Sequence, residues 1–255
     1  MKKKHYLSIA VFSYILFFIV TIPIGTVLST INDSKIIKIR GASGTIWNGQ
    51  AVQISINKNI ILSDTEWSFN AWKTFIGQIA FQINTHHDQQ DITGEVAISF
   101  LQQYSVNDLT AKISAEKVAT LANIPLVQLS GMINLDIDHA HWKQGNLPLA
   151  YGKIIWQNAN VTVAETASLG NVTITLSETE QDLLNADISS KGGDILIDGI
   201  AGLIPEADYT VDLKLTPTAQ ANDNIRNSLS LFAKKQSNGS FLLKKTGRLN
   251  QFGLQ

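Results

Sequence analysis

The segment Ile133-Asn134-Leu135-Asp136-Ile137-Asp138 alternates aliphatic and polar side chains without a break. Successive side chains of a β-strand point to opposite faces, so this spacing predicts a strand with one buried face and one wet face. The same period of two recurs at residues 52–56, 92–100, 172–176 and 211–215. One apolar face per strand is typical of antiparallel sheets. The sequence therefore predicts a mainly β protein built on a twisted antiparallel sheet with a few short helices.

Shorter strands are predicted where aliphatic residues cluster between turn residues, at 35–40, 76–84, 152–156, 182–189, 194–199 and 240–244. Residues 70–75 predict a single short helical turn. Residues 115–121 predict a helix that starts at Ser114 and stops before Pro125. A C-terminal helix is predicted from a cap at Thr218, because Ile225, Leu229 and Phe232 fall at i, i+4 and i+7.

Glycine precedes an aliphatic run at Gly44, Gly94, Gly131, Gly152 and Gly239. One interpretation is that glycine opens each strand after a turn. The other is a duplicated β-unit, since the stretches 43–47 and 151–156 are the most alike. No linker or low-complexity stretch divides residues 29–255, which predicts one β-rich body.

The N-terminus predicts a membrane anchor. Lys2, Lys3 and Lys4 precede a stretch from Tyr6 to Asn32 that contains no Lys, Arg, Asp or Glu. A bilayer needs about 20 mostly apolar helical residues, and lysines favour the cytoplasmic side. The predicted organisation is a cytoplasmic N-terminus at 1–5, a transmembrane helix at 6–28 and an exported domain at 29–255.

A cleaved secretory signal is the alternative for the same segment. Such signals have an apolar core of about 7–15 residues and a small-x-small cleavage site. Here the core is longer, and residues 23–30 offer no Ala-x-Ala. Both interpretations export the domain.

Composition limits the classes of function that fit this chain. The chain has no cysteine, so disulfides do not stabilise an exported domain. Without Lys2–Lys4, 17 of the 20 basic residues remain against 21 acidic ones, a net charge of −4. Nucleic-acid binding would require basic clustering, and the pairs 234–235 and 244–245 are better explained as solvated surface.

No arrangement of residues predicts catalysis. His139 and His141 form a His-x-His pair, but regular alternation would place Asp136 and Asp138 on the other face, leaving no third ligand. Residues 86–88 are predicted to be a solvated loop. Ser43 lacks the sequence of a nucleophile elbow, and no phosphate-binding loop occurs. We therefore predict a protein that is not an enzyme, with no catalytic residues, metal site or cofactor.

Five tryptophans remain: Trp47, Trp67, Trp72, Trp142 and Trp156. Large aromatic residues in strands usually pack in the sheet. We predict that Trp47 and Trp156, in the two most similar stretches, lie mainly buried and act structurally.

The segment Gly41-Ala-Ser-Gly-Thr-Ile-Trp-Asn-Gly-Gln-Ala51 lies shortly after the single predicted N-terminal anchor. This segment resembles the opening signature of the type II secretion system protein N family (GspN). The resemblance continues in order through 66–77, 129–135, 152–159, 168–170, 191–199, 238–241 and 247–249. One departure is Asn70-Ala-Trp72-Lys73, where the family pattern would have a proline and leucines.

The resemblance implies an accessory inner-membrane component of a Gram-negative secretion machine. Residues 29–255 would then be periplasmic, and the partners would be other type II secretion subunits and the inner membrane. A different class also fits the alternating strands, because a curved sheet can hold an acyl chain on its apolar face. That alternative is a membrane-anchored lipid-binding or lipid-transfer protein with a β-groove.

Overall fold

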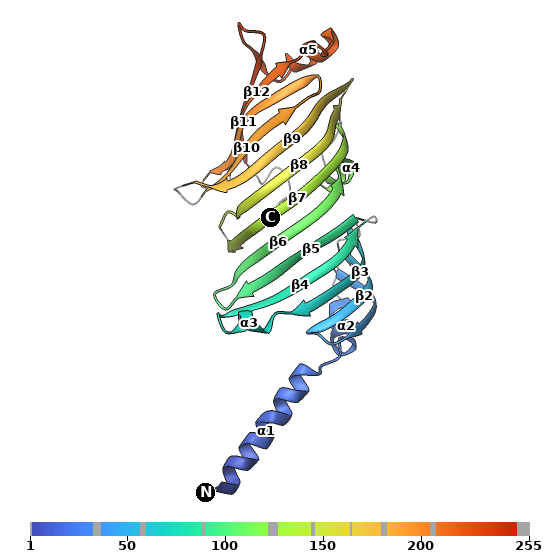
Figure 1. Ribbon diagram of the computed structural model, residues 1–255, viewed down its shortest axis with the longest axis vertical. Helices are drawn as coiled ribbons and strands as arrows, with labels where there is room; N and C mark the ends of the chain where they lie inside the picture. Colours follow the sequence, from blue (N-terminus) through green and yellow to red (C-terminus); the bar gives the residue numbers. More distant parts are fainter. Residues whose placement is uncertain are drawn as a thin grey trace. The chain divides into compact units, whose positions relative to one another are not determined.

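The computed structural model describes residues 2–32, 37–56, 60–87, 90–121, 127–143, 146–163, 165–179, 183–204 and 208–248. These residues form five helices and fourteen strands (Figure 1). Neighbouring strands are neighbours in the chain from β1 to β12, after which β14 lies between β12 and β13. The pairings are antiparallel, for example β1 with β2 and β7 with β8. The predicted mainly β, antiparallel fold is confirmed.

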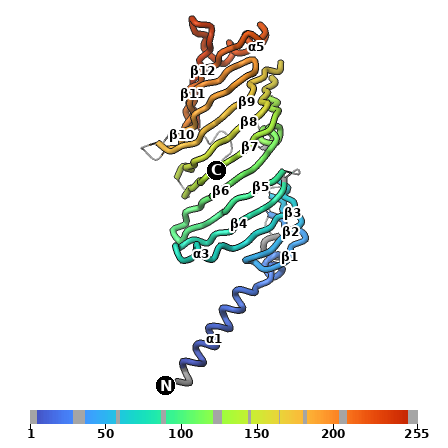
Figure 2. Tube along the Cα trace, viewed as in Figure 1, coloured from blue at the N-terminus to red at the C-terminus, as the bar shows by residue number. Residues whose placement is uncertain are grey.

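The chain divides into two compact units, Met1–Thr93 (unit 1) and Gly94–Gln255 (unit 2), and the boundary falls within strand β5. Within each unit the path is a succession of hairpins (Figure 2). The elements that lie wholly in unit 1 are α1 (Lys2–Val20), α2 (Gly25–Asn32), β1 (Ile37–Gly44), β2 (Asn48–Ile56), β3 (Ile60–Phe69), α3 (Ala71–Thr74) and β4 (Gln78–His87).

Strand β5 (Gln90–Ser99) is followed by the elements of unit 2. These are β6 (Gln103–Ser114), α4 (Ala115–Leu121), β7 (Gln128–Lys143), β8 (Leu149–Thr162), β9 (Thr166–Glu178), β10 (Leu184–Lys191), β11 (Ile195–Ile204), β12 (Asp208–Pro217), α5 (Asp223–Leu229), β13 (Lys234–Lys235) and β14 (Phe241–Arg248). Helix α4 has the predicted bounds, and α3 lies within the predicted turn.

The predicted uninterrupted helix over 6–28 is wrong. Helix α1 ends at Val20, and α2 begins at Gly25. Between them Pro23, which has no backbone N–H, forms an isolated bridge with Thr45. No helix in the described part of the chain combines the length and the apolar character needed to cross a bilayer.

Glycine does not open most of the strands, contrary to the prediction. Gly94, Gly131 and Gly152 lie inside β5, β7 and β8, and Gly44 ends β1. Gly131 has φ +108°, and the register with β8 shifts between Ser130 and Met132, so this glycine marks a bulge. Residues 43–47 form a strand end and a turn, whereas 152–156 lie within β8. The two stretches are therefore not equivalent, which contradicts the duplicated-unit hypothesis for this pair.

The C-terminal helix begins later than predicted. Asn222, not Thr218, caps α5, because its side-chain oxygen accepts a hydrogen bond from the Ile225 N–H at 2.8 Å. Ile225 and Leu229 are buried, whereas Phe232 lies beyond the helix and is exposed. Helix α5 completes the core cluster of unit 2, made up of Ala159, Leu169, Val172, Ile195, Leu215, Ala221, Ile225, Leu229, Ala233 and Phe241.

Candidate functional site

The end of the N-terminal helix is joined to the first hairpin of unit 1. The indole N–H of Trp47 donates a hydrogen bond of 2.8 Å to the carbonyl of Ile19 in the last turn of α1. The Ile24 N–H donates to the Gly44 carbonyl at 3.0 Å, and the Ile46 N–H donates to the Ile22 carbonyl at 3.1 Å. We call residues 19–24 and 44–47 the junction. The junction joins the end of α1 and the residues that follow it to the turn between β1 and β2.

The local sequence explains the turn of the junction. The Thr45 hydroxyl accepts hydrogen bonds from the N–H groups of Trp47 and Asn48, at 3.3 and 3.0 Å. Gly44 has φ +94°, and a Cβ there would lie 2.6 Å from the Asn48 carbonyl oxygen, so only glycine fits. The sequence Gly44-Thr-Ile-Trp47 therefore determines the turn and orients the Trp47 side chain toward α1.

An aromatic row continues from the junction across the sheet. The ring of Trp47 lies 4.8 Å from that of Phe69, which lies 5.5 Å from that of Phe81. Trp47 is half-buried, as is Trp156, so each ring is partly and not fully buried. Tilted aromatic pairs at these separations stabilise packing beyond their buried area. Trp47 thus links the helix end to the packing of β3 and β4.

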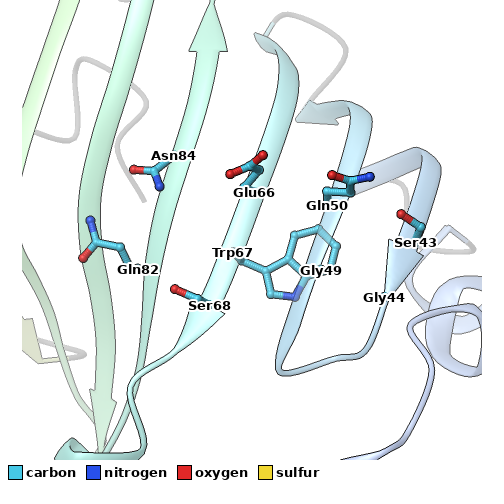
Figure 3. A pocket seen from close by; sticks show the side chains of 9 residues that line it. All are labelled: Ser43, Gly44, Gly49, Gln50, Glu66, Trp67, Ser68, Gln82 and Asn84. Carbon is cyan, nitrogen blue, oxygen red and sulfur yellow. The ribbon is translucent and has the colours of Figure 1, made fainter.

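Beside the junction, unit 1 has a shallow polar depression of about 370 Å³ (Figure 3). Strand pairing aligns its central row, since Ser43 is opposite Gln50, Gln50 opposite Glu66, and Glu66 opposite Asn84. Figure 3 shows the Trp67 indole reaching toward Gly49. The complete lining is Ser43, Gly44, Gly49, Gln50, Glu66, Trp67, Ser68, Gln82 and Asn84.

Hydroxyl, amide and carboxylate groups in one row can hydrogen-bond a protein surface. The depression holds one carboxylate, Glu66, and this side chain is exposed. Sequence reasoning missed this set because β3 was not predicted. The alternation of Glu66 and Ser68 with Trp67 and Phe69 is the signal that would have found it.

The histidines do not assemble a metal centre in the part of the chain that is described, where no group of three or more His, Cys, Asp or Glu could hold a metal ion. His139 is exposed and stacks on Tyr151 with ring centroids 4.5 Å apart. Asp136 and Asp138 are also exposed, and a register shift between Ile137 and His139 interrupts the alternation.

The prediction of a loop at 86–88 is wrong for the two histidines. His86 and His87 belong to β4, and His86 Nε2 lies 3.0 Å from Asp91 Oδ1 with both side chains exposed. Asp88 lies outside the described residues.

In unit 2, segments that carry the family resemblance meet in pairs. The Trp156 indole N–H donates to the Ser130 carbonyl at 3.0 Å, which joins segments 152–159 and 129–135. The Ser168 N–H donates to Asp194 Oδ2 at 2.8 Å, and the Asp194 N–H donates to the Ser168 carbonyl at 2.7 Å. These contacts give the segments a structural role.

The Asp194 turn also contacts the chain that leads to α5. The Thr218 N–H donates to the Asp194 carbonyl at 2.8 Å, and Arg226 Nη2 donates to the Thr218 carbonyl at 2.8 Å. Thr218 therefore fixes the approach to α5 without capping it.

These features define an antiparallel β-sheet protein whose apolar N-terminal helix is tied to its first hairpin. Hydrogen bonds between segments distant in the chain hold its strands together. The profile of the family described as "Type II secretion system (T2SS), protein N" matches residues 35–244. The chain belongs to this family, and the resemblance noted from sequence is confirmed.

A relative with the same description, Type II secretion system protein N of Vibrio cholerae serotype O1, is 19% identical over 235 residues. The alignment covers 91% of this chain and 92% of the relative. No solved structure gives a significant match. Family membership supports an accessory role in type II secretion.

Proposed function

We propose that this protein is a non-enzymatic subunit of the type II secretion apparatus, anchored in the inner membrane by its N-terminal segment. The β-rich region 29–255 lies in the periplasm, binds other secretion subunits and supports protein secretion across the outer membrane. The observation that carries the anchoring is the surface of α1. Every side chain from Tyr6 to Val20 is exposed, and none carries a charge. An apolar surface of this extent requires a cover.

We propose a bilayer as that cover. The uncharged part of α1, residues 6–20, extends about 22 Å at about 1.5 Å per residue, which is shorter than the hydrocarbon thickness of about 30 Å. Local thinning of the bilayer and extended flanking side chains accommodate a mismatch of this kind. Lysine side chains near a helix end can extend to the interface. With Lys2, Lys3 and Lys4 on the cytoplasmic side, the remainder of the chain is exported.

The junction favours a retained anchor over a cleaved signal. Cleavage near Thr30 would remove Ile19, Ile22 and Ile24, whose backbone groups pair with the first hairpin. Ile24 is also buried. The loss would leave the Trp47 indole and the turn at 44–47 without these partners, at a cost to the folded state.

A topology experiment tests the anchor. A reporter that is active only outside the cytoplasm, fused after Gln255, is expected to be active, and changing Lys2, Lys3 and Lys4 to Glu is expected to reduce correct insertion. The mass of the mature protein should include α1. Full activity of a cytoplasm-only reporter, or a mature chain beginning near Thr30, would contradict the anchored topology.

A secretion assay with partner capture tests the role. In a strain that lacks the protein, type II substrates should accumulate in the periplasm, and the intact chain should restore their release. A photo-crosslinker at Asn84 or Gln82 in the polar depression should capture secretion subunits. The same group at Ile61, far along β3 from the junction, is the control. Unchanged secretion, or capture of lipid-transport proteins alone, would refute the proposal.

One observation favours lipid binding as a second candidate. The core cluster of unit 2 includes Ile225 and Leu229 of α5 but no residue of β7, and Ile133, Leu135 and Ile154 are only half-buried. Half-buried apolar side chains on a sheet can line a groove as well as a core. Native mass spectrometry of the purified protein tests whether these side chains line a lipid-binding groove. A reproducible co-purifying lipid would support the groove, and a lipid-free protein would argue against it.

A further inference from the structure

The connection between β3 and β4 presents an unusual apolar surface. Trp72, Phe75 and Ile76 are 80%, 82% and 71% exposed, in and just after α3. The rings of Trp72 and Phe75 lie 5.4 Å apart, so the exposed groups form one cluster. We call these three residues the α3 tip. No residue of α3 is buried, so the tip does not serve the core of unit 1.

Several backbone N–H groups of this segment are hydrogen-bonded within it. The N–H groups of Phe75, Ile76 and Gly77 donate to the carbonyls three residues earlier, at 3.1–3.2 Å. The N–H of Lys73 donates to the Asn70 carbonyl at 3.2 Å. Moving peptide groups out of water is costly when they lack partners. Internal bonding of this kind lowers the cost of placing the tip in a less polar medium.

The α3 tip lies at the same edge of unit 1 as the end of α1. The N–H of Phe69, the last residue of β3 and two residues before α3, donates to the Trp47 carbonyl at 2.8 Å. The indole of the same Trp47 donates to Ile19 at the end of α1. Figure 2 places α3 where β4 begins. Two hydrogen bonds, both made by Trp47, therefore connect the strand end before the tip to the last turn of α1.

We infer that the α3 tip inserts into the interfacial layer of the membrane that holds α1, as a second contact of unit 1 with the lipid. The inference rests on the proposed anchoring of α1. Tryptophan is enriched at membrane interfaces, where its ring lies at the level of the headgroups. Lys73 lies between the exposed aromatic residues, and a lysine favours anionic headgroups.

The position of the tip in unit 1 indicates that lipid covers its exposed side chains. If α1 crosses the bilayer, its end at Ile19 lies near the membrane surface. Segments at that edge of unit 1 then face the headgroups. The opposite edge is where Ile56 pairs with Ile60. Along β3, Ile61 lies eight residues from Phe69, or about 26 Å at about 3.3 Å per residue. Ile61 at that edge is also exposed and apolar, so it serves as a matched control.

Site-specific fluorescence in vesicles tests the inference on the full chain. The chain has no cysteine, so single-cysteine variants can carry a polarity-sensitive dye at Ile76 (tip), Phe12 (α1) or Ile61 (control). The labelled proteins are reconstituted into phosphatidylethanolamine–phosphatidylglycerol vesicles. Emission is then quenched by nitroxide-labelled lipid in one arm and by aqueous iodide in the other.

The dyes at Ile76 and Phe12 should be quenched by nitroxide lipid and show blue-shifted emission, whereas the dye at Ile61 should be quenched by iodide alone. Quenching at Phe12 by lipid with quenching at Ile76 by iodide alone would overturn the inference and keep the anchor. A dye at Ile76 that neither quencher reaches would assign the tip to a protein contact and also overturn it.

Two further outcomes separate this inference from the proposed function. Lipid quenching at Ile76 without quenching at Phe12 would support the tip and refute the anchor. Loss of lipid quenching at both positions would refute both. As a second measurement, the substitutions Trp72→Ser and Phe75→Ser in the Ile76→Cys chain should shift its quenching from lipid to iodide.

Discussion

The indole of Trp47 satisfies a carbonyl at the end of α1, that of Ile19, from 28 positions further along the chain. The last four carbonyls of a helix have no intrahelical donor, so a side chain that donates to one of them fixes where the helix ends. The same ring packs on Phe69. One residue therefore couples the helix, the first hairpin and the aromatic row of unit 1.

Trp47→Phe should loosen the junction while keeping the aromatic contact. Loss of one hydrogen bond costs about 0.5–1.5 kcal/mol. Hydrogen exchange of the backbone amides of Thr21, Ile22 and Ile24 should therefore accelerate, as measured by mass spectrometry. Trp142→Phe is the control, since Trp142 stacks on Tyr104 in unit 2. Equal exchange at 21–24 in the two variants would show that the Trp47 bond does not hold the junction.

Two threonines provide a test of buried polar pairing in unit 1. The hydroxyls of Thr65 and Thr85 lie 2.6 Å apart and are buried, and Thr85 also donates to the Ser63 carbonyl at 3.2 Å. Thr85→Val removes both of these hydrogen bonds and Thr65→Val removes one, so Thr85→Val should cost more, within about 1–3 kcal/mol for the loss of buried hydrogen bonding.

The double Val variant completes the thermodynamic cycle for this pair. Its loss of stability, measured by denaturant unfolding, should be smaller than the sum of the two single losses, because the partners are removed together. Additive losses would indicate that the two hydroxyls do not interact.

Gly131→Ala should destabilise unit 2. A Cβ at this position would lie 2.5 Å from the carbonyl oxygens of Gln157 and Asn158, in a backbone conformation with φ +108°. Backbone strain of this kind costs about 1–3 kcal/mol, and the clash adds to it. Gly239→Ala is the matched control, because Gly239 has φ +83° with nothing within 4 Å of the added Cβ. Thermal unfolding should show the larger loss of stability for Gly131→Ala. Equal losses of stability in the two variants would contradict the close backbone approach at the Gly131 bulge.

Asp194→Ala and Asp212→Ala should differ in cost. Asp194 accepts a hydrogen bond from the Ser168 N–H in a half-buried turn, and bonds to charged groups contribute about 1.5–3 kcal/mol. Asp212 pairs with Lys244 at 2.6 Å, but both side chains are well exposed. Such surface pairs contribute about 0–1 kcal/mol. Chemical denaturation should rank Asp194→Ala as more damaging, and the reverse order would refute this assignment.

Local patterns predicted the helices at 115–121 and 70–75 because the signals that begin and end them are adjacent in sequence. Asn70 precedes α3, and Ser114 precedes α4. The cap of α5 was misplaced because Thr218 and Asn222 are both capping residue types. Only the contacts of Thr218 with Gly193 and Asp194 show that it is used elsewhere.

Strands β3 and β6 escaped prediction because their faces are less clearly divided. Strand β3 contains Asp64, which has φ +48°, at a register shift between Ser63 and Glu66. A bulge moves subsequent side chains to the other face, so the period of two is interrupted at the bulge, leaving only the short alternation of residues 66–69 although pairing continues.

The sequence by itself determined the strand character of segments such as 133–138 and the apolar, uncharged surface of the N-terminal helix, because side-chain alternation and charge are properties of neighbouring residues. Only the tertiary structure decided that the helix stops at Val20, that Trp47 reaches Ile19, and that Ser168 meets Asp194. These features depend on hydrogen bonds between residues 26 and 28 positions apart, which form once the hairpins bring them together.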